Sequence, residues 1–158
     1  MSRNAADWQQ LNQRVIEEFR ANGGVVRGRR WPVILLTTSG ARTGRPHVTP
    51  LNFSRDQGCL VVIASKGGSA SHPDWYLNLV ANPEVTIEDG PETYRARARI
   101  AAEPERSRLF DQQAAQMTFF DGYRRRVKSR QIPVVVFERI ERQQVVQDDR
   151  PPDGRGGD

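Results

Sequence analysis

The chain has 158 residues, 37% of them hydrophobic, and a formal net charge of +5, which favours an anionic partner. Its length fits one domain, and no apolar run comes near the ~20 residues that a membrane-spanning helix needs. The single cysteine, Cys59, excludes an internal disulfide and a cysteine-based zinc site, and the N-terminal region lacks a signal-peptide core, so we expect a cytoplasmic protein.

The first half of the chain predicts one helix followed by three strands. Apolar side chains at helical spacing indicate a helix over residues 7–21, which Gly23 and Gly24 end. Strands are expected at residues 33–38, 47–54 and 59–64. Because the 59–64 strand is apolar throughout, we expect it to be central in the sheet and covered on both faces.

The second half predicts two further helices and three further strands. Pro73 suits the first position of a helix that continues to residue 81, and Pro104 opens another that reaches Met117. Strands are expected at residues 85–88, 93–100 and 132–137. Within the 93–100 strand, arginines alternate with less polar side chains and therefore share one face.

Short links between these strands favour a small, mostly antiparallel barrel with helices packed outside, rather than a doubly wound parallel sheet. We assign residues 1–142 to this single domain. Residues 143–158 are dominated by Gln, Asp, Pro and Gly, which predicts a disordered tail.

The segment "TTSGARTGRP", residues 37–46, is the first candidate for a binding site. Gly40 and Gly44 allow backbone amides to approach a ligand closely, and such amides can form an anion-binding concavity. Arg42 and Arg45 add charge-assisted hydrogen-bond donors. The alternative is an exposed hairpin that needs its glycines for the turn alone.

The segment "ASKGGSASHPDWYLNL", residues 64–79, is the second candidate. Ser65 and Lys66 follow a buried strand, and a glycine loop then leads to a helix N-terminus, a combination that suits a phosphate or carboxylate. Trp75 is expected to fill the core, and its alternative role is to line the site.

The segment "MTFFDGYRRR", residues 117–126, is the third. Phe119, Phe120 and Tyr123 could cap a planar ligand, and the Tyr123 hydroxyl could donate a hydrogen bond or a proton. Alternatively the aromatic residues fill the core beside a solvated arginine face. We find no carboxylate pair, metal-ligand cluster or Ser-His-Asp arrangement, and we expect His47 and His72 to be structural, so any chemistry should come from a bound cofactor.

Three segments resemble the deazaflavin-dependent nitroreductase family of actinobacteria. They are "LLTTSGARTGRPHVTPLNF", "VIASKGGSASHPDWYLNLVANPEVTI" and "IPVVVFERI", and the similarity covers about residues 12–140 with order and spacing intact. The resemblance implies an FMN-binding-like split β-barrel that binds coenzyme F420, an 8-hydroxy-5-deazaflavin with a phosphate and a polyglutamate tail. It further implies hydride transfer from the reduced deazaflavin to a quinone, an enone or a nitroaromatic compound.

The resemblance also implies a set of cofactor-binding residues. The 41–43 turn and Lys66 would hold the tail and the phosphate, residues 47–52 and 63–65 would run along the ring, and residues 75–78 would close the tail end. The full set is Ala41, Arg42, Thr43, His47, Val48, Thr49, Pro50, Leu51, Asn52, Ile63, Ala64, Ser65, Lys66, Asp74, Trp75, Tyr76, Asn78 and Phe120. Ser65 and Tyr123 are the candidates for stabilising charge on the acceptor.

The chain departs from the family pattern at three positions. Ala41 and His47 replace basic residues common in the family, for which Arg45 could compensate, and Phe120 stands where nitro-reducing members tend to have tyrosine. Split barrels often pair, so we expect a homodimer, with peripheral access to membrane quinones as a further option. The competing interpretations are a non-catalytic barrel that stores a cofactor or fatty acid, and a nucleic-acid-binding module using the arginines, which lacks a recognition motif.

Overall fold

The computed structural model describes residues 5–127 and 130–140, so the predicted tail lies outside the described residues. Within them, seven strands form one antiparallel sheet in the order β2-β1-β5-β6-β7-β4-β3. The elements in chain order are α1 (Ala5–Ala21), β1 (Val33–Ser39), β2 (Pro46–Asn52), β3 (Ser54–Asp56), β4 (Cys59–Ile63), the short 3-10 helix η1 (Lys66–Gly68), α2 (Asp74–Ala81), β5 (Glu84–Asp89), β6 (Glu92–Ile100), α3 (Glu105–Gln116), α4 (Phe119–Arg126) and β7 (Val134–Arg139).

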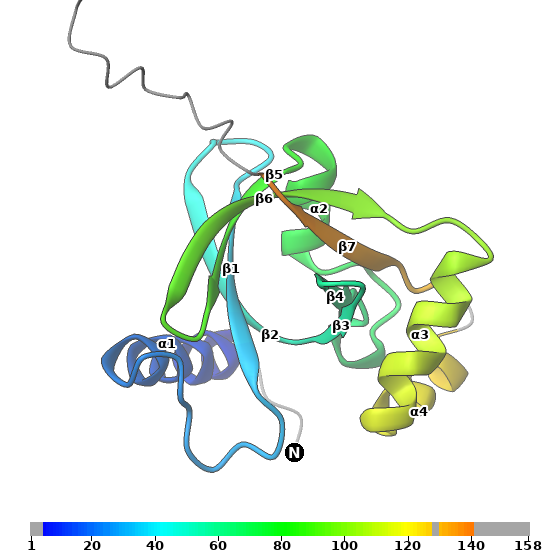
Figure 1. Cartoon of the computed structure of the whole chain (residues 1–158), viewed down its shortest axis with the longest axis horizontal. Coiled ribbons are helices and arrows are strands. Elements are labelled where there is room, and N and C mark those ends of the chain that lie inside the picture. Colours follow the sequence, from blue (N-terminus) through cyan, green and yellow to red (C-terminus); the bar gives the residue numbers. More distant parts are fainter. Residues whose placement is uncertain (1–4, 128–129, 141–158) are drawn as a thin grey trace, which may run out of the picture.

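The sheet curls into a half-barrel, which confirms the predicted antiparallel barrel architecture (Figure 1). Helices α1, α3 and α4 pack on its outside, whereas α2 packs Trp75 and Leu79 into the core that the sheet encloses. Helix α1 lies beside the β5–β6 hairpin, whereas α3 and α4 lie on the opposite side of the barrel. None of the helices in the described part of the chain is both long and apolar enough to cross a membrane.

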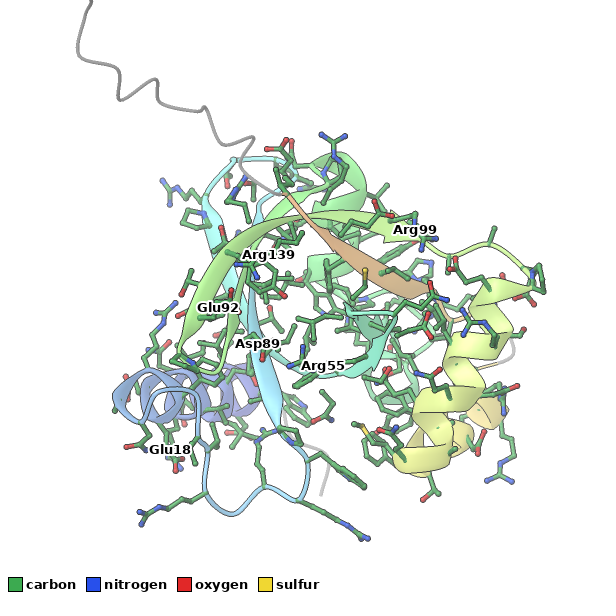
Figure 2. All side chains as sticks on the ribbon, in the orientation of Figure 1. Glu18, Arg55, Asp89, Glu92, Arg99 and Arg139 are labelled. Atoms are coloured by element: carbon green, nitrogen blue, oxygen red, sulfur yellow. The ribbon has the colours of Figure 1, made fainter. Side chains whose placement is uncertain are left out.

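The predicted strand at 47–54 is in fact two strands that meet at Phe53. β2 and β3 occupy the two opposite edges of the sheet order, so the corner at Phe53 carries the chain from one edge to the other. Arg55 of β3 donates two hydrogen bonds, of 3.0 and 2.8 Å, to the Asp89 carboxylate of β5, and Figure 2 shows the two side chains pointing toward each other. Both bonds come from Nη2 of Arg55, and this ion pair ties the short edge strand to β5 in the middle of the sheet.

Strand β4 is buried on both faces, as predicted, but it is not central. Leu60 and Val62 pack with Trp75 and Leu79 of α2, whereas Val61 and Ile63 face the cluster that contains residues of α3 and α4. The strand nevertheless lies next to the sheet edge, between β7 and the three-residue β3. Helices on both sides of a curled sheet can bury a penultimate strand completely, so apolar content alone gave the wrong position.

Residues 119–126 form an additional helix, α4, which the sequence pattern did not predict. The segment has only eight residues and contains Gly122, so its helical periodicity is too short to recognise. Its first-turn residue Phe120 is buried, and Tyr123 lies against Gly68 of η1. The helix therefore brings the third aromatic segment to the loop that follows β4.

The arginines on one face of β6 form solvent-exposed ion pairs with neighbouring glutamates. Arg95 and Arg97 are exposed beside Glu84, and Arg99, labelled in Figure 2, bonds to both Glu105 and Glu138. These two carboxylates raise the pKa of the Arg99 guanidinium. The positive charge of this face is thus offset by neighbouring acidic residues.

Candidate functional site

Two hollows adjoin each other and share Trp75 as a wall. The first, which we call the aromatic cavity, has a volume of about 490 Å³. It is lined by Trp8, Leu11, Arg29, Pro50, Leu51, Asn52, Ile63, Ser65, Lys66, Trp75, Phe119, Phe120 and Tyr123. The second, the arginine groove, has a volume of about 660 Å³ and is lined by Gly40, Ala41, Arg42, Thr43, Arg45, His47, Val48, Thr49, Asp74, Trp75, Leu77 and Asn78.

The aromatic cavity suits a flat, largely apolar ligand. Its walls come from the end of β2, the end of β4, α1 and α4, and its size falls in the range typical of small-molecule sites. Ser65 is only 6% exposed, and its hydroxyl makes no hydrogen bond to any other residue in the described ranges. It is therefore available to a bound molecule. The cavity lining contains two cations, Arg29 and Lys66, and no Asp or Glu.

The arginine groove is built on a tightly closed turn between β1 and β2. The Gly40 amide donates to the Arg45 carbonyl (2.8 Å), and the Gly44 amide donates to the Gly40 carbonyl (2.8 Å). A Cβ atom on Gly40 would lie 3.0 Å from Nε2 of His47 and 3.1 Å from Oγ1 of Thr43, so a larger residue here would require these side chains to shift. The turn presents cationic side chains on a fixed backbone, an arrangement suited to anions.

Asn78 of α2 fastens this turn to the rest of the barrel. Its Oδ1 accepts a hydrogen bond from the Ala41 amide (3.0 Å), and its Nδ2 donates to Oγ1 of Thr38 (3.2 Å). Asn78 and Thr38 are both buried. In contrast, the amides of Arg42 and Thr43 have no backbone acceptor within the described residues, so they can serve an incoming anion.

The sequence-predicted residues fall into three groups. Those in the aromatic cavity are Pro50, Leu51, Asn52, Ile63, Ser65, Lys66, Phe120 and Tyr123. Those in the arginine groove are Ala41, Arg42, Thr43, His47, Val48, Thr49, Asp74 and Asn78, and Trp75 lines both hollows. Ala64 and Tyr76 line neither, because Ala64 is fully buried in the core and Tyr76 packs against His72 and Trp75. The binding roles themselves stay predictions.

Several lining residues were missed by the sequence analysis. Trp8 and Leu11 come from α1, and Arg29 comes from the loop that follows it. The amphipathic pattern of α1 predicted only that one face would be buried, and it carried no signal that the N-terminal end of the helix would face a cavity. Phe119 was noted as part of an aromatic cluster, and it lies at the cavity wall.

His72 contacts Arg130 within the fold, and its environment gives a pH dependence. Burial and the neighbouring Arg130 guanidinium lower the pKa of its imidazole from the usual 6.5. Its Nδ1 lies 3.1 Å from Nη1 of Arg130 and can accept that hydrogen bond only when it is unprotonated.

We therefore expect the free energy of unfolding to decrease as the pH falls below about 6.5, where the unfolded chain binds a proton that the folded His72 resists. His72→Asn keeps an acceptor for Arg130 but cannot titrate, so its stability should change less between pH 7.5 and 5.5. Urea unfolding of both proteins across this range measures the effect. Asp56, Glu103 and Glu105 have lowered pKa values, so their contributions are lost only at more acidic pH. Parallel curves for the two proteins would refute the assignment to His72.

Comparison with known proteins identifies relatives of the whole barrel. A family model described as F420H(2)-dependent quinone reductase matches residues 10–139, which include every lining residue of the two hollows except Trp8. An F420H(2)-dependent quinone reductase of Mycobacterium tuberculosis, Rv1261c, is 39% identical over 111 residues, which cover 68% of this chain and 74% of the relative.

Two solved structures extend the comparison. An F420-H2 dependent reductase, FDR-A, is 34% identical with a TM-score of 0.63, and the alignment covers 73% of this chain and 100% of that one. A structure described as a domain-swapped dimer is 32% identical with a TM-score of 0.65, covering 85% of this chain and 100% of that one. These matches agree with the split-barrel architecture expected from the sequence.

Proposed function

The chain belongs to the F420H(2)-dependent quinone reductase family, and from this membership we propose how its two hollows bind the coenzyme and the quinone. The protein uses reduced coenzyme F420 as hydride donor and a small quinone as acceptor. The observation that carries the proposal is the junction of an aromatic cavity with an arginine groove at Trp75. A flat ring with a polyanionic tail needs these two environments side by side.

The residues of the arginine groove fit the tail of the coenzyme. Arg42 and Arg45 can form charge-assisted hydrogen bonds to carboxylates, and the amides of Arg42 and Thr43 have no backbone acceptor within the described residues. Lys66 lines the aromatic cavity, and we assign it to the phosphate of the coenzyme. Asp74 also lines the groove and is the one acidic residue in its lining. The cationic side chains outnumber it.

The residues of the aromatic cavity fit the ring and the acceptor. Coenzyme F420, when bound in its reduced form, supplies a hydride from C5 of the deazaflavin. Leu51, Ile63 and Trp75 offer apolar surface to a ring and exclude water from it. The hydroxyls of Ser65 and Tyr123 line the same cavity, and we assign them to hydrogen bonds with the quinone oxygen as negative charge develops there.

Binding and turnover are tested together on the purified protein. Coenzyme F420 fluorescence should be quenched on binding, and addition of menadione to the reduced complex should return the coenzyme to its oxidised absorbance. Binding without turnover across a panel of quinones and enones would favour the non-catalytic storage interpretation. No detectable binding at micromolar protein would contradict the proposal.

The charge of the aromatic cavity leads to a prediction about acceptors. Since Arg29 and Lys66 line it without an accompanying carboxylate, an anionic quinone should gain more from Arg29 than a neutral one does. We expect Arg29→Gln to lower kcat/KM for 1,2-naphthoquinone-4-sulfonate about 5- to 10-fold and for menadione less than about twofold, as expected for one partly exposed charge contact.

The matched control is Arg27→Gln, which removes a cation from the same loop at a position that does not line the cavity. It should leave both values unchanged. Equal losses for the charged and the neutral quinone in Arg29→Gln would show that Arg29 acts on the fold or on coenzyme binding instead.

We also propose that the protein is a homodimer. The support is the structural relative described as a domain-swapped dimer, which aligns over its whole length with this chain. Light scattering coupled to size-exclusion chromatography measures the mass directly, and a monomeric mass at micromolar concentration would contradict the proposal.

A further inference from the structure

Arg130 lies four residues before the start of β7 at Val134, and its side chain reaches the loop that joins β4 to α2. Its Nε and Nη2 donate to the Ser69 carbonyl (3.2 and 3.0 Å), Nη2 also donates to the Ser65 carbonyl (2.9 Å), and Nη1 donates to the Ala64 carbonyl (3.1 Å). Nη1 is also 3.1 Å from Nδ1 of His72. One guanidinium therefore holds both ends of η1.

The loop that Arg130 holds has a backbone that needs such support. Lys66 has a φ of +49°, in the left-handed region that residues other than glycine rarely adopt. On either side of Lys66, the Gly68 amide donates to the Ser65 carbonyl (3.1 Å), and the Ser69 amide donates to the Lys66 carbonyl (3.1 Å). The Ser65 carbonyl thus accepts from both Arg130 and Gly68, so the guanidinium and the turn stabilise the same conformation.

Arg130 does not line either hollow, and no carboxylate among the described residues forms an ion pair with it. Its partners are three backbone carbonyls and one imidazole, and the three guanidinium nitrogens all take part, which the single ammonium group of lysine cannot reproduce. The residues it holds include Ser65 and Lys66, which do line the aromatic cavity. Any effect of Arg130 on coenzyme binding must therefore pass through the loop.

We propose that Arg130 is a positioning residue that fixes residues 64–69 in the conformation that directs Ser65 and Lys66 into the aromatic cavity. The proposal rests on the proposed function, because it assigns the reason for this positioning to coenzyme binding. It goes beyond that function in placing a determinant of coenzyme affinity outside both hollows, on a segment that follows α4.

A double-mutant cycle tests the route through Lys66. Arg130→Lys should raise the dissociation constant for coenzyme F420 about tenfold, because several charged hydrogen bonds that hold the loop are lost. In the Lys66→Ala variant, the additional change Arg130→Lys should raise the dissociation constant by less than about threefold. The proposal would be overturned if the fold-change in the double variant equalled the product of the fold-changes in the two single variants. An unchanged dissociation constant in Arg130→Lys would also overturn it.

A measurement without coenzyme separates this proposal from the proposed function. Hydrogen exchange of the apo protein should become faster at the Gly68 and Ser69 amides in Arg130→Lys, and unchanged at the Gly40 and Gly44 amides of the distant turn. Arg125→Lys, an exposed arginine on α4, is the matched control and should behave as the wild type. Wild-type exchange at Gly68 and Ser69 in Arg130→Lys overturns the positioning role, whereas failure of wild-type protein to bind coenzyme overturns the proposed function alone.

Discussion

Lys66→Ala is expected to weaken binding of coenzyme F420 by about 10- to 100-fold, the range for losing one charged hydrogen bond to an anionic group. The Lys66 side chain is exposed, and its Nζ donates only to Oγ of Ser71 (3.2 Å) within the described residues. Few native contacts are lost, so the melting temperature should hardly change. Fluorescence titration with the oxidised coenzyme measures the dissociation constant.

The salt dependence of this titration identifies the cause. Lys66→Arg keeps the charge and should retain most of the affinity, whereas Lys66→Ala should show a weaker dependence of affinity on salt than the wild type. Arg125→Ala removes one exposed cation on α4 and serves as the control for net charge. An unchanged dissociation constant in Lys66→Ala would remove this residue from the site and weaken the assignment of the aromatic cavity to the ring.

Much of the barrel followed from local patterns in the sequence. The helices at 7–21, 73–81 and 104–117 and five of the six predicted strands correspond to observed elements within a few residues at their ends, because apolar periodicity and the Gly and Pro signals act locally. The sixth, at 47–54, covers β2 and the start of β3. The corner at Phe53 could not be predicted, since it is defined by the pairing of β2 and β3 with different edges of the sheet. Such pairing is a long-range property.

The candidate site was predictable in parts but not as a whole. Glycines and cations at 40–45 and at 65–68 indicated two anion-binding segments, but no local pattern indicated that Trp75 would separate two adjoining hollows. Trp75 is 7% exposed and belongs to the core, so the interpretation as core filling and the interpretation as site wall are both compatible with its position. Arg130 is 65 residues from Ser65 in the chain, and its contacts depend on the packed fold.

Asn78→Asp is the second substitution for which we expect a large effect, because it changes charge at nearly constant shape. The carboxylate can still accept from the Ala41 amide, and the Thr38 hydroxyl can turn to donate to it, so both hydrogen bonds of Asn78 have a counterpart. The new negative charge lies in the lining of the arginine groove. Two like charges about 8 Å apart repel by about 2 kcal/mol at an effective dielectric constant of 20, so coenzyme affinity should fall about 30-fold.

Coenzymes of different length show whether this repulsion acts on the tail. A deazaflavin truncated before the phosphate should bind Asn78→Asp and wild type within about twofold of each other, because the repelled groups are missing. Asn82→Asp, at the exposed C-terminal end of the same helix, carries the same charge change outside the groove and should bind the full coenzyme normally. If Asn78→Asp weakened binding of the full and the truncated molecules equally, the tail would not bind in the arginine groove. The truncated molecule lacks the negative charges that the new carboxylate repels, so its loss of affinity would need another cause.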